Sequence, residues 1–163
     1  MARRAGRGLR GRAGFARGLL HARPEASLLT GFCGDQHDPA LAERWTAAQA
    51  AAGAEVQFAM LDGGRPGAIA ACRAAGIRAI GNVRDWTVVD PVFLASAVAD
   101  NGVAVEAAVA AFLEGRFVDR RLGLEEPAAV RLALAGDVDP ALAARVAALR
   151  EAVLSGAVEV AES

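Results

Sequence analysis

Short apolar runs alternate with longer helical patterns from Ser27 onward, and this alternation limits the possible folds more than any other feature of the chain. Strands separated by helices of this length run parallel, because each helix carries the chain back to the same end of the sheet. The pattern therefore predicts an α/β fold with a doubly wound parallel sheet. The expected strands cover residues 27–33, 55–61, 77–82, 92–98 and 130–134.

Aspartate followed by proline marks the start of two expected helices, at Asp38-Pro39 and at Asp139-Pro140. The carboxylate can cap the free N–H groups of the first turn, and proline fits the first helical position because the N–H that it lacks would have no partner there. The expected helices cover residues 39–52, 68–75, 103–113 and 140–154. A small hairpin over residues 117–125 and a terminal strand over residues 157–160 complete the expected elements.

Positive charge is concentrated at the start of the chain. The first 24 residues hold seven arginines and no acidic residue, whereas the rest holds eleven arginines and nineteen acidic residues, which gives a net charge of −8. An acidic surface is a poor match for the phosphates of nucleic acid, so no nucleic-acid partner is expected. Glycines at positions 6, 8, 11 and 14 disfavour a helix. Residues 1–13 are therefore expected to form a basic flexible head, and residues 14–163 a single α/β lobe.

The sequence has no run of 18 apolar residues, so no transmembrane helix is expected. The basic start is similar to the charged end of a signal peptide, but the apolar segment that should follow it is missing. From these residues alone, the chain would be cytoplasmic if it is complete.

Several kinds of catalysis lack the residues that they need. The chain has no lysine and no tyrosine, which removes Schiff-base chemistry and a tyrosine acid. No serine or cysteine lies in a nucleophile elbow, and no phosphate-binding loop supports the alternative of a small Rossmann-like enzyme. Cys33 and Cys72 lack the spacing of metal ligands, and His37 lies between two aspartates on a loop too short to close a tetrahedral site. We therefore expect no enzyme, no catalytic residue, no metal and no cofactor.

Doubly wound sheets bind ligands beyond the carboxyl ends of their strands. The loops expected at these ends cover residues 34–38, 62–67 and 83–90. In the first loop, Gln36 can donate and accept hydrogen bonds in one plane, as a nucleobase edge or a carboxamide requires. In the second loop, Gly63 and Gly64 would let the backbone approach a ligand closely, although a plain strand-to-helix turn needs the same residues.

The strongest candidates lie at the start of the third loop. The amide of Asn82 suits a hydroxyl group, and Arg84 could pair with an anionic group or with Asp85. Trp86 offers either a ring face on which a ligand stacks or a hydrophobic cover over the end of the sheet. The predicted ligand-binding residues are Gln36, Gly63, Gly64, Asn82, Arg84, Asp85 and Trp86.

An ordered set of short motifs extends over most of the chain. The set comprises Asp38-Pro39, residues 53–56 (GAEV), 76–85 (GIRAIGNVRD), Ser96 on an expected strand, 115–117 (GRF), 122–124 (LGL) and 156–160 (GAVEV). With these motifs, residues 14–160 resemble the basic membrane protein (Med-type) family of substrate-binding proteins, which serve ABC importers and have the type I periplasmic-binding fold. Family members have two lobes, and this chain resembles the second lobe only.

The resemblance implies a function and a location. It implies the substrate-binding component of an ABC importer, with a small polar, nucleoside-like ligand at the carboxyl ends of the strands and an ABC permease as partner. It implies a periplasmic protein or, as a basic membrane lipoprotein, one anchored outside the cytoplasm. The first lobe and a secretion signal are expected to be missing. The helix over residues 103–113 would then expose an apolar face, which favours a homodimer.

Three positions depart from the pattern of the family. Gln36 occupies a sequence position where relatives often carry an aromatic residue, and Ala99 lies near the sequence position where relatives often carry a lysine. Val83 replaces the first of two aspartates, of which Asp85 is the second. These departures weaken the transfer of nucleoside recognition. Two alternatives therefore stay open, a cytoplasmic ligand-sensing regulatory domain of the same fold and a non-binding remnant lobe.

Overall fold

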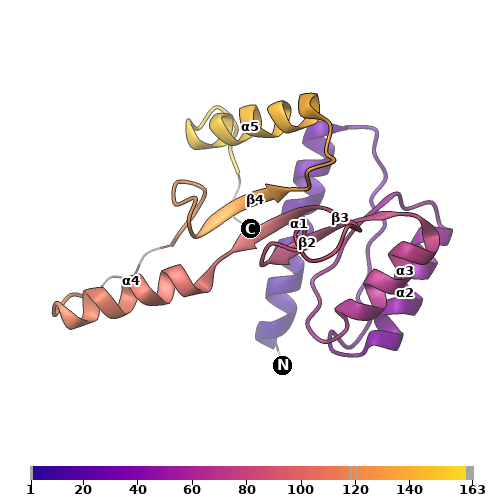
Figure 1. Ribbon diagram of the computed structural model, residues 1–163, viewed down its shortest axis with the longest axis horizontal. Helices are drawn as coiled ribbons and strands as arrows, with labels where there is room; N and C mark the ends of the chain where they lie inside the picture. The colour runs from indigo at the N-terminus through magenta and orange to yellow at the C-terminus, as the bar shows by residue number, and fades with distance from the viewer. Residues whose placement is uncertain (1, 118, 120, 161–163) are drawn as a thin grey trace. The chain divides into compact units, whose positions relative to one another are not determined.

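The structure is a computed structural model that describes residues 2–117, 119 and 121–160 (Figure 1). These residues form two compact units, one that extends to Ile77 and one from Arg78 to Val160. Both units contain helices and strands, which confirms the predicted α/β class.

The described part of the first unit contains α1 (Ala2–Ala22), α2 (Pro39–Ala51), β1 (Val56–Phe58) and α3 (Arg65–Ala75). α2 begins as predicted. One carboxylate oxygen of Asp38 accepts hydrogen bonds from the backbone N–H groups of Ala40 and Leu41, at 2.8 and 3.1 Å. α3 begins earlier than predicted and ends at Gly76, whose φ of 68° is left-handed. Glycine adopts this conformation without the penalty that a Cβ atom brings.

α2 and α3 pack with their backbones in direct contact. A Cβ atom at Gly67 would overlap the carbonyl oxygen of Pro39 and lie 2.7 Å from its carbonyl carbon. Buried Ala42, Ala68 and Ala71 have small side chains that permit the same close approach. The first unit therefore depends on small residues where these two helices meet.

A buried polar network joins α2, β1 and α3. The side-chain amide of Gln57 donates to Thr46 Oγ1 at 2.7 Å and to Gln49 Oε1 at 3.1 Å. Its carbonyl oxygen accepts from Cys72 Sγ at 3.4 Å. Thr46 and Cys72 are fully buried, and each has a partner in this network, so the network fixes the three elements without an unsatisfied polar atom.

α1 includes the segment in which the glycines of the sequence predict an irregular, basic head. Phe15 stacks on Phe58, with 5.3 Å between ring centroids and 5° between ring planes. A Cβ atom at Gly11 would overlap the sulfur of Met60, so glycine allows the helix to approach this residue. Tertiary packing thus offsets the low helix propensity of glycine.

The predicted strand over residues 27–33 is wrong, because these residues are irregular. Leu29 and Phe32 are exposed, and a Cβ atom at Gly31 would lie 2.6 Å from the ring of Trp45. A short apolar run becomes a strand only where a neighbouring strand offers a hydrogen-bonding partner, and periodicity does not reveal that partner.

The described part of the second unit contains β2 (Arg78–Val83), β3 (Phe93–Ala99), α4 (Asn101–Leu113), β4 (Val130–Leu134) and α5 (Pro140–Leu154). β2 and β3 pair in parallel, with Gly81 opposite Ser96. β4 runs antiparallel to β3, with Arg131 opposite Val98. The unit thus adds an antiparallel strand to a parallel pair, an arrangement common in α/β sheets.

Both expected helices of the second unit are confirmed, α4 with Asp100 as its cap and α5 with Asp139. The predicted strand over residues 130–134 is confirmed as well. The predicted hairpin and terminal strand are not found, because the described residues of 117–125 and 157–160 contain no strand. Residues 118 and 120 of the hairpin lie outside the described residues. None of the described helices is long and apolar enough to cross a membrane.

The contact at Gly67 predicts that Gly67→Ala destabilises the protein by about 3 kcal/mol, because the new methyl group must push α3 away from Pro39. Urea unfolding followed by circular dichroism measures the change. Gly18→Ala is the matched control. Gly18 also lies in a helix but has open space around it, so its replacement should leave stability unchanged or raise it. Equal stability of the two variants would contradict the packing.

Burial raises the pKa of the Cys72 thiol from its ordinary 9.0 to about 11. The unfolded chain therefore loses this proton at lower pH than the folded protein, so the free energy of unfolding should fall as pH rises from 9.0 to about 11. The chain has no lysine or tyrosine to titrate in this window. Denaturant unfolding of Cys72→Ala across the same pH range should lack this fall, whereas Cys33→Ala should keep it. A fall that persists in Cys72→Ala would refute the assignment.

Candidate functional site

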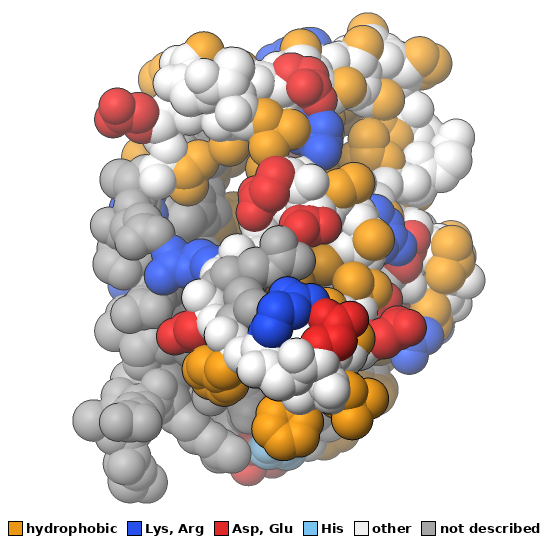
Figure 2. Space-filling view, turned by 90° about the vertical axis from the view of Figure 1, so that its left-hand side faces the viewer, with side chains coloured by type: hydrophobic (Ala, Val, Ile, Leu, Met, Phe, Trp, Pro, Cys, Tyr) orange, Lys and Arg blue, Asp and Glu red, His pale blue; other side chains and the backbone are white. Residues whose placement is uncertain are grey.

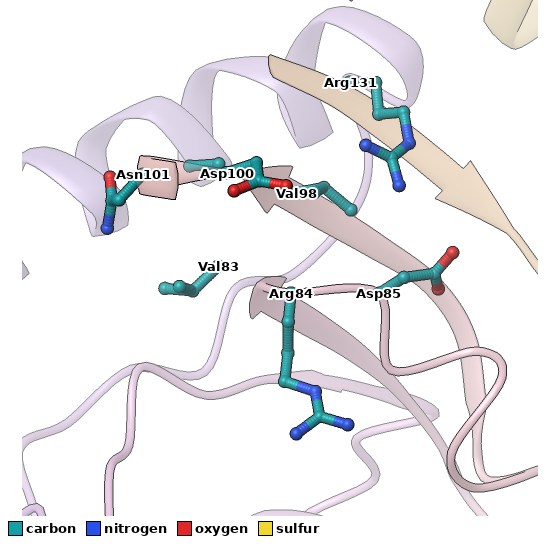
Figure 3. Close-up of a pocket in the computed structure, with 8 residues that line it drawn as sticks. Val83, Arg84, Asp85, Val98, Asp100, Asn101 and Arg131 are labelled. Atoms are coloured by element: carbon teal, nitrogen blue, oxygen red, sulfur yellow. The ribbon is translucent and has the colours of Figure 1, made fainter. Parts of the chain in front are cut away.

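A cavity of about 270 Å³ lies at the carboxyl ends of β2 and β3, within the second unit (Figure 3). Its volume is near the lower end of the range for small-molecule sites. The lining combines apolar side chains with two arginines, two aspartates and an asparagine. The lining residues are Val83, Arg84, Asp85, Val98, Ala99, Asp100, Asn101 and Arg131.

Each of the two aspartates that line the cavity also accepts hydrogen bonds from a residue two positions later in the chain. Oδ1 of Asp85 accepts hydrogen bonds from the backbone N–H and the hydroxyl of Thr87, at 3.0 and 2.6 Å. Oδ1 of Asp100 accepts from the backbone N–H of Gly102 at 2.9 Å, at the start of α4. These bonds fix the orientation of each carboxylate and use one of its two oxygens.

Arg131 reaches the cavity from β4. The antiparallel register places Arg131 opposite Val98, and Figure 3 shows its guanidinium on the side of the cavity where Asp85 and Asp100 lie. Arg84 points in a different direction (Figure 3), and its guanidinium carbon lies 4.8 Å from the centre of the Trp86 ring. The two cations of the cavity are therefore separated, and Arg84 is held by a cation–π contact.

Val83 ends β2 in a strained backbone conformation. Its φ is 71°, which lies in the left-handed region that β-branched residues rarely occupy. Arg84 follows directly, and its backbone N–H donates to the carbonyl oxygen of Asn82 at 2.9 Å. Strained residues of this kind cluster at ligand sites, where the surrounding structure holds them in place.

The turn after β2 is fixed by tight packing on the strand. The Trp86 indole N–H donates to the carbonyl oxygen of Asn82 at 3.0 Å. The hydroxyl of buried Ser96 donates to the carbonyl oxygen of Arg84 at 2.6 Å. A Cβ atom at Gly81 would lie 2.6 Å from the Trp86 ring and 2.7 Å from Ser96 Oγ, so only glycine allows this packing. Trp86 thus packs against the last residues of β2.

The predicted residues of the first unit lie together on another pair of loops. The backbone carbonyl oxygen of Gln36 accepts hydrogen bonds from the backbone N–H groups of Asp62 and Gly64, at 3.1 and 2.9 Å. Cβ atoms at Gly63 and Gly64 would lie 3.1 and 2.9 Å from the carbonyl oxygens of His37 and Gln36. The two glycines therefore allow close approach between two backbone segments of this protein.

The structure thus separates the seven predicted residues into two groups. Arg84 and Asp85 line the cavity, while Asn82 and Trp86 form the turn that holds them. Sequence reasoning missed Asp100 and Asn101, although both lie within three residues of the end of a predicted strand, where the same rule about strand ends applied. It also missed Arg131, because no pattern in the sequence gave the register of β4. Among the described residues, no group of three or more metal-ligating side chains is placed to hold a metal ion.

No family model and no curated protein matches the chain. Solved structures do. An ABC transporter solute-binding protein from Conexibacter woesei is 25% identical, with a TM-score of 0.69 over 90% of this chain and 50% of its own. One from Aeropyrum pernix is 19% identical, with a TM-score of 0.65 over 82% of this chain and 47% of its own.

A transcriptional activator of the comK gene from Bacillus halodurans is similar as well. It is 18% identical, with a TM-score of 0.65 over 77% of this chain and 45% of its own. The chain therefore spans about half the length of each of these proteins. Its fold is the Rossmann-like α/β fold of periplasmic-binding proteins.

The strain at Val83 predicts that Val83→Asn stabilises the protein by about 1 kcal/mol, because asparagine tolerates a left-handed backbone better than valine does. Thermal and urea unfolding measure the gain. Val88→Asn is the control, since Val88 is also an exposed valine but has no positive φ. An equal effect of the two substitutions would show that polarity, and not strain, determines the change.

Proposed function

We propose that this chain is a solute-binding lobe of the basic membrane protein type, which binds a small polar solute for an ABC importer. The cavity at the carboxyl ends of β2 and β3 is the observation that carries the proposal. Ligands of open α/β sheets bind at this edge. The ordered motifs between residues 14 and 160 and the fold of the ABC solute-binding proteins support the same interpretation.

The lining of the cavity suits a ligand with several polar groups and one apolar face. Asp85 and Asp100 provide carboxylate oxygens for hydroxyl or amine donors, and Arg131 provides donors for an acceptor. Val83 and Val98 provide apolar surface beside them. A nucleoside combines hydroxyl groups, ring acceptors and a flat apolar face, so we retain a nucleoside-like solute as the candidate ligand.

The lobe would act by closure and not by catalysis. In a two-lobe binding protein, the ligand contacts both lobes and stabilises the closed state in proportion to its differential affinity. On this proposal residues 14–163 correspond to the second lobe, and an ABC permease is the partner that recognises the closed form. The proposal carries with it a location outside the cytoplasm, in the periplasm or on a lipid anchor.

A ligand-sensing regulatory domain is the second candidate. It is favoured by one observation, the similarity of fold to the transcriptional activator from Bacillus halodurans. Both candidates require a solute at the same strand ends, and they differ in what the liganded lobe contacts. Pull-down of a permease subunit by the liganded protein would support transport, and pull-down of transcription components would support regulation.

The proposed site is tested by solution NMR titration of the ¹⁵N-labelled chain with nucleosides, sugars and amino acids, a method that detects weak binding. We expect a nucleoside to shift the amide signals of residues 83–85 and 98–101. Asp85→Asn should weaken binding about 10- to 100-fold, because it removes a charged acceptor but keeps an oxygen for Thr87. Glu159→Gln, which removes an exposed charge that does not line the cavity, should leave the affinity unchanged.

Two results would refute this proposal. If no solute of the panel shifts any amide signal, the chain is not a solute-binding lobe for these classes. If a solute binds with an affinity that Asp85→Asn leaves unchanged, the ligand site lies elsewhere.

A further inference from the structure

α4 is apolar on every side, yet it is nearly unburied. Apart from Asn101 and Glu106, its side chains are apolar or absent, and Ala111 is its one buried residue among those described. A helix that is hydrophobic all round is normally covered by other protein. Figure 1 shows α4 extending away from the strands of its own unit.

Four large side chains of α4 form one stripe, whereas Val103 lies on the opposite face of the helix. Val105, Val109, Phe112 and Leu113 are 53% to 78% exposed, and their spacing places them on one face of the helix. Phe117, which is 91% exposed, lies four residues beyond the end of the helix. Figure 2 views the molecule from the side toward which α4 extends and shows hydrophobic side chains at that surface. We call these five residues the α4 stripe.

We propose that the α4 stripe is a dimer interface, in which α4 packs antiparallel against α4 of a second copy around a two-fold axis near Val109. The stripe is self-complementary in this arrangement, as a two-fold interface requires. With Val109 at the axis, Leu113 of one copy lies opposite Val105 of the other, so large side chains meet along the stripe. The alanines between the large residues let the two helices approach closely.

Charge at the ends of the stripe favours the antiparallel direction. Asp100 caps the start of α4, and Arg116 follows its end, where it donates from Nε to Glu114 at 3.0 Å. With Val109 at the axis, Arg116 of one copy lies beside Asp100 of the other. A parallel pair would instead bring like charges together at each end and align the two helix dipoles.

The area of the α4 stripe determines how tightly the two copies are expected to bind. Burial of the five side chains in both copies removes on the order of 1,000 Å² of surface from water, near the lower limit for a specific interface. The dimer should therefore be reversible and depend on concentration. Sedimentation velocity of the full chain from about 5 to 500 µM should show a monomer that converts to a dimer.

Two substitutions on opposite faces of α4 test the interface. Val109→Glu places two like charges at the axis and should weaken dimerisation at least 10-fold. Ala107→Glu adds the same charge to the opposite, exposed face of the helix and should leave the dimer intact. Both residues are exposed, so both variants should fold, and circular dichroism verifies this.

Disulfide trapping tests the direction of the helices. In a Cys33→Ala background, a mixture of Val105→Cys and Leu113→Cys chains should form a mixed disulfide dimer under mild oxidation, whereas Val105→Cys alone should not cross-link. Cys72 is fully buried and stays protonated, so it does not compete. A monomer at every concentration, a dimer that Val109→Glu leaves intact, equal disruption by Ala107→Glu, or cross-linking of Val105→Cys with itself would each overturn the proposal.

Discussion

Parallel pairing of β2 with β3 is the interaction on which the second unit depends. The register places Gly81 opposite Ser96. The space that a side chain at Gly81 would occupy is filled by the Trp86 ring and the Ser96 hydroxyl. That packing fixes the turn after β2, and the turn fixes Arg84 and Asp85 at the rim of the cavity. A site of this kind rests on the sheet and not on a loose loop, which is how α/β folds position ligand-binding groups.

The elements that the sequence predicted correctly have local causes. Asp38 and Asp139 cap α2 and α5 with their own carboxylates, and Gly76 ends α3 in a left-handed conformation. The elements that it predicted wrongly or missed depend on distant partners. Residues 27–33 are apolar enough for a strand but are irregular, and α1 forms over several glycines where Phe15 stacks on Phe58. Local patterns do not report such contacts.

The same distinction explains the candidate site. Arg84 and Asp85 were predictable because they follow a strand, and strand ends carry the ligands of this fold. Arg131 was not, because it reaches the cavity through the antiparallel register of β4. Gly63 and Gly64 are compatible both with close approach of a ligand and with a plain strand-to-helix turn, and in the structure they make room for the backbone of Gln36 and His37. Glycine indicates close approach without indicating what approaches.

We propose two binding surfaces on the second unit, an apolar helix for a second copy of the chain and a polar cavity for a solute. Binding of a solute in the cavity is the main proposal. Amide hydrogen exchange with saturating nucleoside tests it most directly, because binding slows exchange where the ligand orders the backbone. We expect slower exchange in peptides that cover residues 82–87 and 98–102, with no change across α5. Protection confined to other segments, or none at all, would contradict it.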